Sequence, residues 1–174
     1  MTHADPILHV SIILPIYRTA EALDELYSRL CKTLETSALT FELLMIDDGS
    51  PDNSWAIIQR LANQDSRVKG VRFSRNFGQH PAIAAGFERA CGKHIVLMDS
   101  DLQDRPEDVP RLLKELHDEI DVVYTVKEGA PSGGLVRLTS LLYHYTFSRV
   151  TGAEVPRNVG TFRAFSRRFL NAVC

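Results

Sequence analysis

Apolar residues along the chain form two kinds of run: short continuous ones, and longer ones in which they recur every three or four positions. The continuous runs predict buried strands over His9–Ile16, Phe41–Ile46, Val68–Phe73, His94–Met98 and Asp121–Val126. The spaced runs predict helices over residues 22–34, 50–61, 82–90 and 106–116. This alternation predicts an α/β fold with a mostly parallel sheet and helices on both of its faces.

The second predicted helix opens with Ser50 and Pro51, a favourable pair for an N-cap and a first helical turn. Beyond the fifth strand the pattern changes. Residues 127–134 are rich in Gly and Pro and predict a loop, residues 135–149 predict a helix, and residues 155–162 predict an extended segment. The end of the chain has the pattern of a strand running into a helix without a cap. We therefore expect residues 1–174 to be a single domain of a longer protein.

Composition narrows the class of protein. The net charge of -2 over 174 residues gives no electrostatic argument for binding nucleic acid. Cys31, Cys91 and Cys174 are far apart and odd in number, so we expect small buried side chains in a reducing compartment. Neither a signal peptide nor a run of about 20 apolar residues is present, so we expect this fragment to be soluble.

Polar residues gather where the predicted strands end. Pro15-Ile16-Tyr17 follows the first strand, Asp47-Asp48-Gly49-Ser50 the second, and the stretch from Asp99 to Asp104 the fourth. Because ligands of such sheets bind at the carboxyl ends of the strands, we expect these segments to converge on one rim. They would form an acidic cluster with an aromatic ring beside it.

Asp99 and Asp101 are two positions apart, so a turn can direct both carboxylates at one ion. Hard cations such as Mg²⁺ or Mn²⁺ favour oxygen ligands, and the amide of Gln103 can add a third. A diphosphate beside two carboxylates would be repelled without such a metal. Asp48 is a candidate acceptor for a base or ribose, and Tyr17 is a candidate stacking partner for the base.

Each of these features also has a simpler interpretation. The acidic pair and the Asp-Gly-Ser string are typical of solvated turns and caps. His80 is more typical of an ordinary loop histidine than of a general base. Seven cations at or beyond the strand ends could grip phosphate or be plain surface charge, namely Arg72, Arg75, Lys127, Arg137, Arg163, Arg167 and Arg168.

Several strings resemble one known family, in family order and over nearly the whole chain. They are Ile13-Leu14-Pro15-Ile16-Tyr17, Ile46 to Ser50, Phe73-Ser74-Arg75-Asn76-Phe77-Gly78, Met98 to Asp104, Asp121-Val122-Val123-Tyr124, and Gly160-Thr161-Phe162-Arg163. The sequence resembles glycosyltransferase family two, with its Rossmann-like GT-A fold. Within that family it is similar to the polyprenyl-phosphate branch, which includes dolichol-phosphate mannose synthase and bacterial undecaprenyl-phosphate glycosyltransferases.

The resemblance implies a role for particular residues. Nucleotide binding is assigned to Pro15, Tyr17, Asp47, Asp48, Arg75 and Asp99. The metal ion is assigned to Asp99, Asp101 and Gln103, the acceptor phosphate to Lys127, Arg137 and Arg163, and catalysis to Asp99, Asp101 and Arg163. Two positions depart from the branch, because Lys127 stands where Arg is frequent and Thr161 where Asp is frequent.

The implied reaction is an inverting transfer of a sugar from a nucleotide-diphosphate donor to a polyprenyl phosphate, with Mg²⁺ or Mn²⁺. The acceptor is already an anion, so positioning, metal and cations replace a strong general base. The full-length protein is then expected at the cytoplasmic face of the inner membrane, held there by membrane-associated segments beyond Cys174, with its oligomeric state open.

Four alternatives remain. A saccharide acceptor within the same family and a nucleotide-sugar-binding module without turnover are open. A nucleotidyltransferase is disfavoured because no Gly-rich loop follows the first strand, and a phosphoacceptor receiver domain because its acidic pair would follow that strand.

Overall fold

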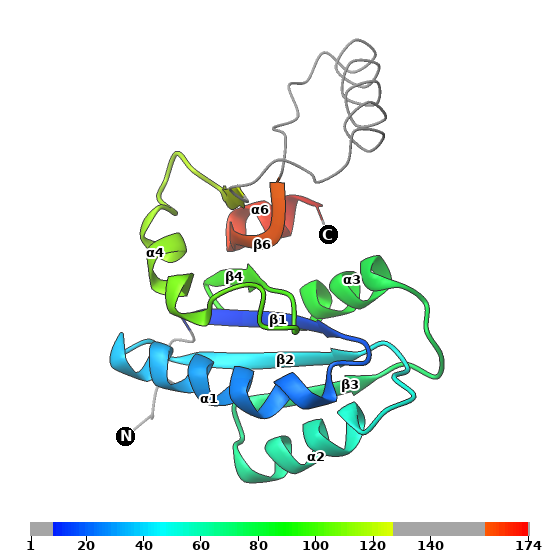
Figure 1. Ribbon diagram of the computed structural model, residues 1–174. Helices are drawn as coiled ribbons and strands as arrows, with labels where there is room; N and C mark the ends of the chain where they lie inside the picture. Colours follow the sequence, from blue (N-terminus) through cyan, green and yellow to red (C-terminus); the bar gives the residue numbers. More distant parts are fainter. Residues whose placement is uncertain (1–8, 127–158, 174) are drawn as a thin grey trace, which may run out of the picture. The chain divides into compact units, whose positions relative to one another are not determined.

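The computed structural model describes residues 9–126 and 159–173 of the chain (Figure 1). The chain divides into two units, Met1–Tyr124 with Thr161–Cys174, and Thr125–Gly160. Few residues of the second unit are described, so the fold concerns the first.

The described strands form one six-stranded sheet. They are β1 Val10–Ile16, β2 Phe41–Asp47, β3 Val68–Arg72, β4 His94–Leu97, β5 Val122–Val126 and β6 Val159–Ser166, in the spatial order β3-β2-β1-β4-β6-β5. β1 pairs in parallel with both β2 and β4, and β2 in parallel with β3. β6 runs antiparallel to β4. The predicted mostly parallel sheet is confirmed.

Helices cover both faces of this sheet, as predicted. They are α1 Ala20–Thr36, α2 Ser54–Gln64, α3 Gln79–Arg89, α4 Val109–Lys114 and α6 Arg167–Val173, with a 3-10 turn at Pro106–Asp108 before α4. Leucines of α1 and apolar residues of α2 and α4 pack on one face of the central strands. Residues of α3 and α6 pack on the other face.

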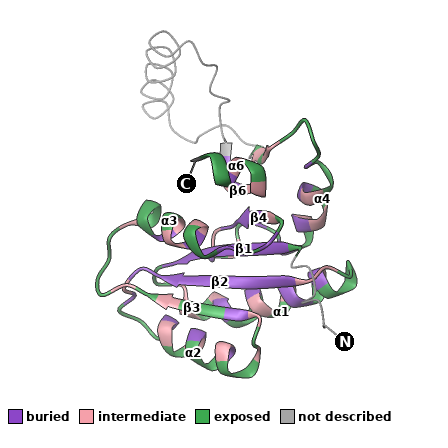
Figure 2. Cartoon of the chain, turned by 180° about the vertical axis from the view of Figure 1, so that it is seen from behind, coloured by how far each residue is buried: buried purple, intermediate pink, exposed green. Residues whose placement is uncertain are grey.

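The central strands are buried on both faces, which is why they appear in the sequence as continuous apolar runs (Figure 2). In β1, Ile12 and Leu14 face the α1 side, whereas Ile13 faces α3. α3 approaches β1 closely at Gly86, where an added Cβ would lie 2.4 Å from Cγ2 of Ile13. Burial of these side chains contributes roughly 1.5–3 kcal/mol each to folding.

The predicted cap at Ser50 is wrong, because α2 begins four residues later, at Ser54. The backbone N–H of Ser50 instead donates to Oδ1 of Asp47 (2.9 Å), and its hydroxyl accepts the N–H of Arg18 (3.2 Å). Near the helix start, Asp52 Oδ1 accepts the N–H of Ser54 (3.1 Å). Ser50 therefore holds a turn between two strand ends rather than a helix.

Other expectations have mixed outcomes. Cys31 is buried as expected, but the prediction is wrong for Cys91, which is exposed in the short connection between α3 and β4. β6 and α6 confirm the strand running into a helix. The predicted loop at 127–134, the helix at 135–149 and Cys174 lie outside the described residues. Among the helices that are described, none combines the length and the apolar character needed to cross a bilayer.

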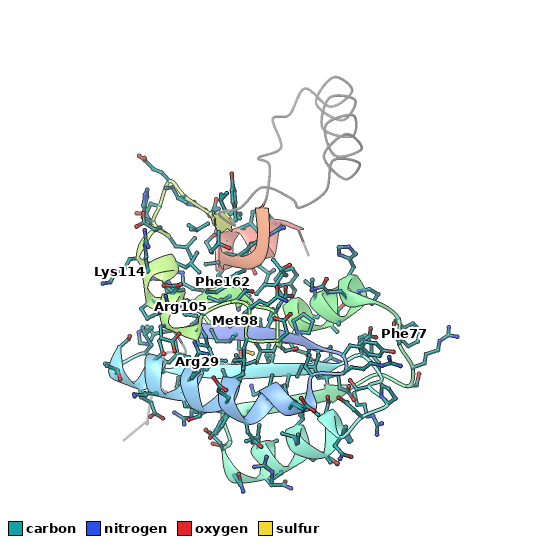
Figure 3. All side chains as sticks on the ribbon, in the orientation of Figure 1. Arg29, Phe77, Met98, Arg105, Lys114 and Phe162 are labelled. Carbon is teal, nitrogen blue, oxygen red and sulfur yellow. The ribbon has the colours of Figure 1, made fainter. Side chains whose placement is uncertain are left out.

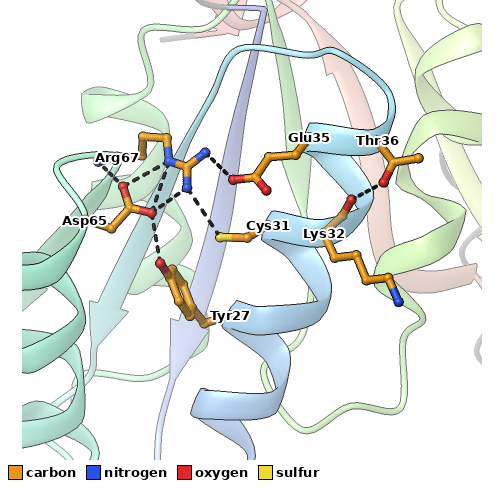
Figure 4. A network of polar contacts seen from close by, with 7 residues as sticks. All are labelled: Tyr27, Cys31, Lys32, Glu35, Thr36, Asp65 and Arg67. Carbon is orange, nitrogen blue, oxygen red and sulfur yellow. Dashed lines mark hydrogen bonds and ion pairs between the residues drawn. The ribbon is translucent and has the colours of Figure 1, made fainter.

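A polar cluster ties α1 to the connection between α2 and β3 (Figure 4). Arg67 forms ion pairs with Asp65 (Nη2–Oδ2, 2.7 Å) and Glu35 (Nη1–Oε1, 2.8 Å), and its guanidinium lies 4.4 Å from the centre of the Phe41 ring. The hydroxyl of Tyr27 donates to Asp65 Oδ2 (2.9 Å). The hydrogen bonds from Arg67 lower the pKa of Asp65 to about 2. Burial and the bond to Asp65 raise the pKa of Tyr27 to about 12.

Replacing Asp65 by Asn should lower the free energy of unfolding by about 1–2 kcal/mol at pH 7, since the side chain of Asp65 is only 11% exposed. The folded pKa of Asp65 is depressed, so its contribution is complete above the unfolded pKa of 3.8 and lost toward pH 2. Urea unfolding of both proteins between pH 7 and pH 2 measures this. A wild-type advantage that does not shrink below pH 4 would contradict the assignment.

Candidate active site

A cleft of about 340 Å³ opens at the carboxyl edge of the sheet. Its walls come from the residues after β1, after β2 and after β4, and from the start of α3. They are Pro15, Ile16, Tyr17, Thr19, Asp48, Asn76, Gly78, Gln79, Ala82, Asp99, Ser100 and Asp101. The chain leaves β1 toward β2 and later returns to β4 on the opposite side of β1. The cleft therefore lies where open α/β sheets bind their ligands.

The wall after β1 carries the aromatic ring predicted from the sequence. Tyr17 lines the cleft and is 41% exposed, with the guanidinium of Arg18 lying 5.3 Å from the centre of its ring. Pro15 lines the cleft as well, and its carbonyl accepts the hydroxyl of Ser100 (3.0 Å). That bond joins the ends of β1 and β4. A flat, accessible ring beside polar groups is suited to stacking on a nucleotide base.

Asp48 lines the cleft but is itself almost fully buried. Its Oδ1 accepts the backbone N–H of Phe77 (2.7 Å), and its Oδ2 accepts that of Gly78 (2.8 Å). Hydrogen bonds to an ionised carboxylate are the stronger kind. Asp48 therefore fixes the loop between β3 and α3, a role that its sequence pattern did not indicate, while its contact with a nucleotide stays a prediction.

Two residues assigned to the nucleotide do not line the cleft. Asp47 lies beneath it, fully buried, with Oδ1 accepting the N–H of Ser50 and Oδ2 lying 3.3 Å from Nε of Arg72. Arg75 places its guanidinium 4.8 Å from the centre of the exposed ring of Phe77, on the loop before α3 (Figure 3). Asp47 therefore supports the turn.

The wall after β4 holds the acidic pair. Asp99 and Asp101 both line the cleft, and Asp99 Oδ1 accepts the side-chain N–H of Gln79 (2.9 Å). The backbone N–H of Asp99 donates to Oδ2 of the buried Asp104 (3.2 Å). Asp101 Oδ1 accepts the N–H of Gln103 (3.0 Å), which closes the turn. The side chain of Gln103 is exposed and does not line the cleft.

These residues fit a hard divalent cation. Two carboxylates on one wall supply oxygen ligands and leave other coordination positions to water and phosphate oxygens, as Mg²⁺ and Mn²⁺ prefer. Within residues 9–126 and 159–173, no group of three or more His, Cys, Asp or Glu side chains is arranged around a single metal position. The fit therefore rests on Asp99 and Asp101, without a third side chain of these types.

The predicted acceptor cations are not brought together at the cleft. Arg163 pairs in register with Leu97 on the neighbouring strand and does not line the cleft, while Lys127 and Arg137 lie outside the described residues. Arg167 donates to the carbonyls of Ala90 (2.8 Å) and Gly92, at the amino end of β4. Arg168 pairs with Asp121 (2.9 Å). Both therefore fasten α6 at the edge opposite the cleft.

Sequence patterns missed part of the α3 side of the cleft. Gln79 contacts Asp99, and Asn76, Gly78 and Ala82 line the wall near it, but only a strand-end position had been taken as a sign of function. The string around Phe77 and Gly78 was the available signal. His80, one residue further along α3, is exposed and not part of the wall.

Comparison with known proteins decides the family. The model of the family described as "Glycosyl transferase family 2" matches residues 11–174. The chain belongs to this family. It is 38% identical over 174 residues to an undecaprenyl-phosphate 4-deoxy-4-formamido-L-arabinose transferase of Shewanella sediminis, covering 99% of this chain and 53% of the relative. It is 37% identical over 169 residues to the transferase of the same name from Pseudomonas fluorescens, covering 97% and 50%.

Solved structures support the same fold. A mannosyltransferase from Pyrobaculum calidifontis, in complex with GDP-Man and Mn²⁺, superposes with a TM-score of 0.66 at 19% identity, covering 97% of this chain and 47% of that one. Glucosyl-3-phosphoglycerate synthase from Mycobacterium tuberculosis, with Mn²⁺, UDP and phosphoglyceric acid, gives 0.67 at 20% identity, covering 92% and 56%. The GT-A fold of family 2 is thereby confirmed. The chain spans about half the length of these relatives.

Gly49 is required where the β2 turn meets the loop before α3. Its φ is +65°, and an added Cβ would lie 2.5 Å from the backbone carbon of Arg75. Gly49→Ala should cost more stability than the roughly 1–3 kcal/mol of backbone strain alone. Gly78→Ala is the control, since Gly78 has φ +99° but open space around it. Denaturant unfolding measures both, and an equal cost for the two would contradict the close contact.

Proposed function

We propose that the protein transfers a sugar from a nucleotide-diphosphate donor, in the presence of a divalent cation, to a polyprenyl phosphate. The observation that carries this proposal is the pairing, in one cleft, of two accessible carboxylates with an accessible aromatic ring. Asp99 and Asp101 stand on the β4 wall, and Tyr17 on the β1 wall. Such a cleft suits a ligand with a flat base at one end and a charged diphosphate at the other.

The roles of the residues follow from their positions. Tyr17 would stack on the base, and Pro15 would shape the pocket beside it. Asp99 and Asp101 would hold Mg²⁺ or Mn²⁺, and the bound ion would neutralise charge that develops on the departing diphosphate. The rest of the wall would orient the sugar for attack from the face opposite the leaving group, which inverts the anomeric centre.

The acceptor follows from the family and from the cleft. The curated relatives are named as undecaprenyl-phosphate transferases. A phosphate oxygen is already an anion and needs no base to remove a proton, whereas a hydroxyl acceptor does. Within the described residues, the acids that line the cleft are Asp48, Asp99 and Asp101. Asp48 is engaged by backbone N–H groups and the other two are the metal candidates, so a phosphate acceptor is favoured over a saccharide.

Arg163, Lys127 and Arg137 remain the proposed cations for the acceptor phosphate. A membrane-embedded acceptor places the full-length protein at the cytoplasmic membrane face, through segments beyond this chain. The proposal of catalysis, rather than nucleotide-sugar binding alone, is supported by the curated relatives, which are named as transferases.

Removal of one carboxylate tests the metal role. Asp101→Ala should weaken Mn²⁺-dependent binding of a nucleoside diphosphate at least tenfold, about 1.4 kcal/mol, since the ion loses one of two charged ligands. Isothermal calorimetry with and without Mn²⁺ measures it. Asp118→Ala removes an exposed carboxylate outside the cleft and should change nothing. Unaltered binding to the Asp101 variant would overturn the metal assignment.

The acceptor proposal is tested with the full-length protein. Polyprenyl phosphate should be glycosylated far faster than the matching polyprenol, because only the phosphate offers an anionic nucleophile. Arg163→Ala should raise the KM for polyprenyl phosphate, whereas Arg111→Ala, at an exposed position of α4, should not. Equal rates with the alcohol and the phosphate would refute the phosphate acceptor.

A further inference from the structure

One contact crosses the cleft from α3 to the acidic pair. Gln79, the first residue of α3, donates its side-chain N–H to Oδ1 of Asp99 at 2.9 Å. An ionised carboxylate only accepts hydrogen bonds, so the amide must turn its NH₂ group toward Asp99. The bond occupies Oδ1 and leaves the second carboxylate oxygen to meet a cation. Gln79 is also exposed and lines the cleft.

The start of α3 is itself held in place. Asp48 accepts the backbone N–H groups of Phe77 and Gly78, the two residues before Gln79. Gly78 has φ +99°, a conformation that favours glycine, and this turn directs the chain into the helix. The position of Gln79 therefore depends on a buried carboxylate at the end of β2.

The backbone of Asp99 is fixed separately. Its N–H donates to Asp104, and the neighbouring Ser100 donates its hydroxyl to the carbonyl of Pro15. These bonds place the Cα of Asp99 but not its carboxylate, which can still rotate about the side-chain bonds. The hydrogen bond from Gln79 is the contact that selects one orientation of the carboxylate plane.

We propose that Gln79 is a positioning residue for the divalent cation: it orients Asp99, so that metal binding in the cleft depends on the start of α3. Groups that hydrogen-bond to metal ligands orient them, and their loss lowers metal affinity about 10–100-fold. The proposal rests on the proposed function, since it takes Asp99 as a metal ligand. It adds a path of contacts, from Asp48 through the α3 start to Asp99, between the walls after β2 and after β4.

Gln79→Met tests this role, because Met has a similar length but cannot donate a hydrogen bond. Mn²⁺ affinity, measured by electron paramagnetic resonance of free Mn²⁺ in the presence of nucleoside diphosphate, should fall about tenfold. Nucleoside diphosphate affinity without Mn²⁺ should be unchanged. Gln59→Met is the matched control, at an exposed position of α2 outside the cleft, and should bind Mn²⁺ like the wild type.

A double-mutant cycle separates positioning from direct contact. If Gln79 acts through Asp99, then Gln79→Met should cause no further loss in an Asp99→Ala background. A further loss there, an equal loss of metal-free nucleotide binding, or unchanged Mn²⁺ affinity of the single variant would each overturn the positioning role alone. A wild-type protein that binds nucleotide without any dependence on Mn²⁺ would overturn the proposed function as well.

Discussion

The parallel pairing of β1 with β2 on one side and with β4 on the other is the constraint on which the site depends. Since all seven residues of β1 are buried, this strand cannot shift without exposing core side chains on both faces of the sheet. The connections after β1 and β4 therefore leave the sheet at the same edge but on diverging paths. The opening between them is the cleft, and its position is fixed by the sheet before any polar residue contributes.

Polar contacts then give that opening its shape, and several come from buried groups. Asp48 holds the loop before α3, Asp104 holds the backbone of Asp99, and Ser100 joins the ends of β1 and β4. A buried carboxylate is costly unless hydrogen bonds satisfy it. Asp48 meets this condition through two backbone N–H groups, so it stabilises a defined loop conformation. The acids with exposed faces, Asp99 and Asp101, are left for the ligand.

Strand positions and the clustering of Tyr17, Asp99 and Asp101 could be predicted, because burial produces apolar runs and parallel strands end at one edge. The start of α2 could not, since Ser50 has the right residue type for a cap but Asp47 captures its N–H. Asp48 resembled a ligand contact, but its partners are backbone groups 29 and 30 positions away, which no local pattern reveals. Gln79 was missed for the same reason, because its contact with Asp99 exists only once α3 and β4 are in place.

Binding of a divalent ion and a nucleotide at this edge of the sheet is the central claim. Nuclear magnetic resonance of the protein with a nucleoside diphosphate and a small, increasing amount of Mn²⁺ tests it most directly, because the paramagnetic ion broadens the signals of nuclei near it. The backbone amide signals of Gln79, Asp99 and Asp101 should weaken first, while those of Glu42 and Asp65, away from the cleft, stay sharp. Broadening centred on another part of the molecule, or none that depends on the nucleotide, would contradict the account.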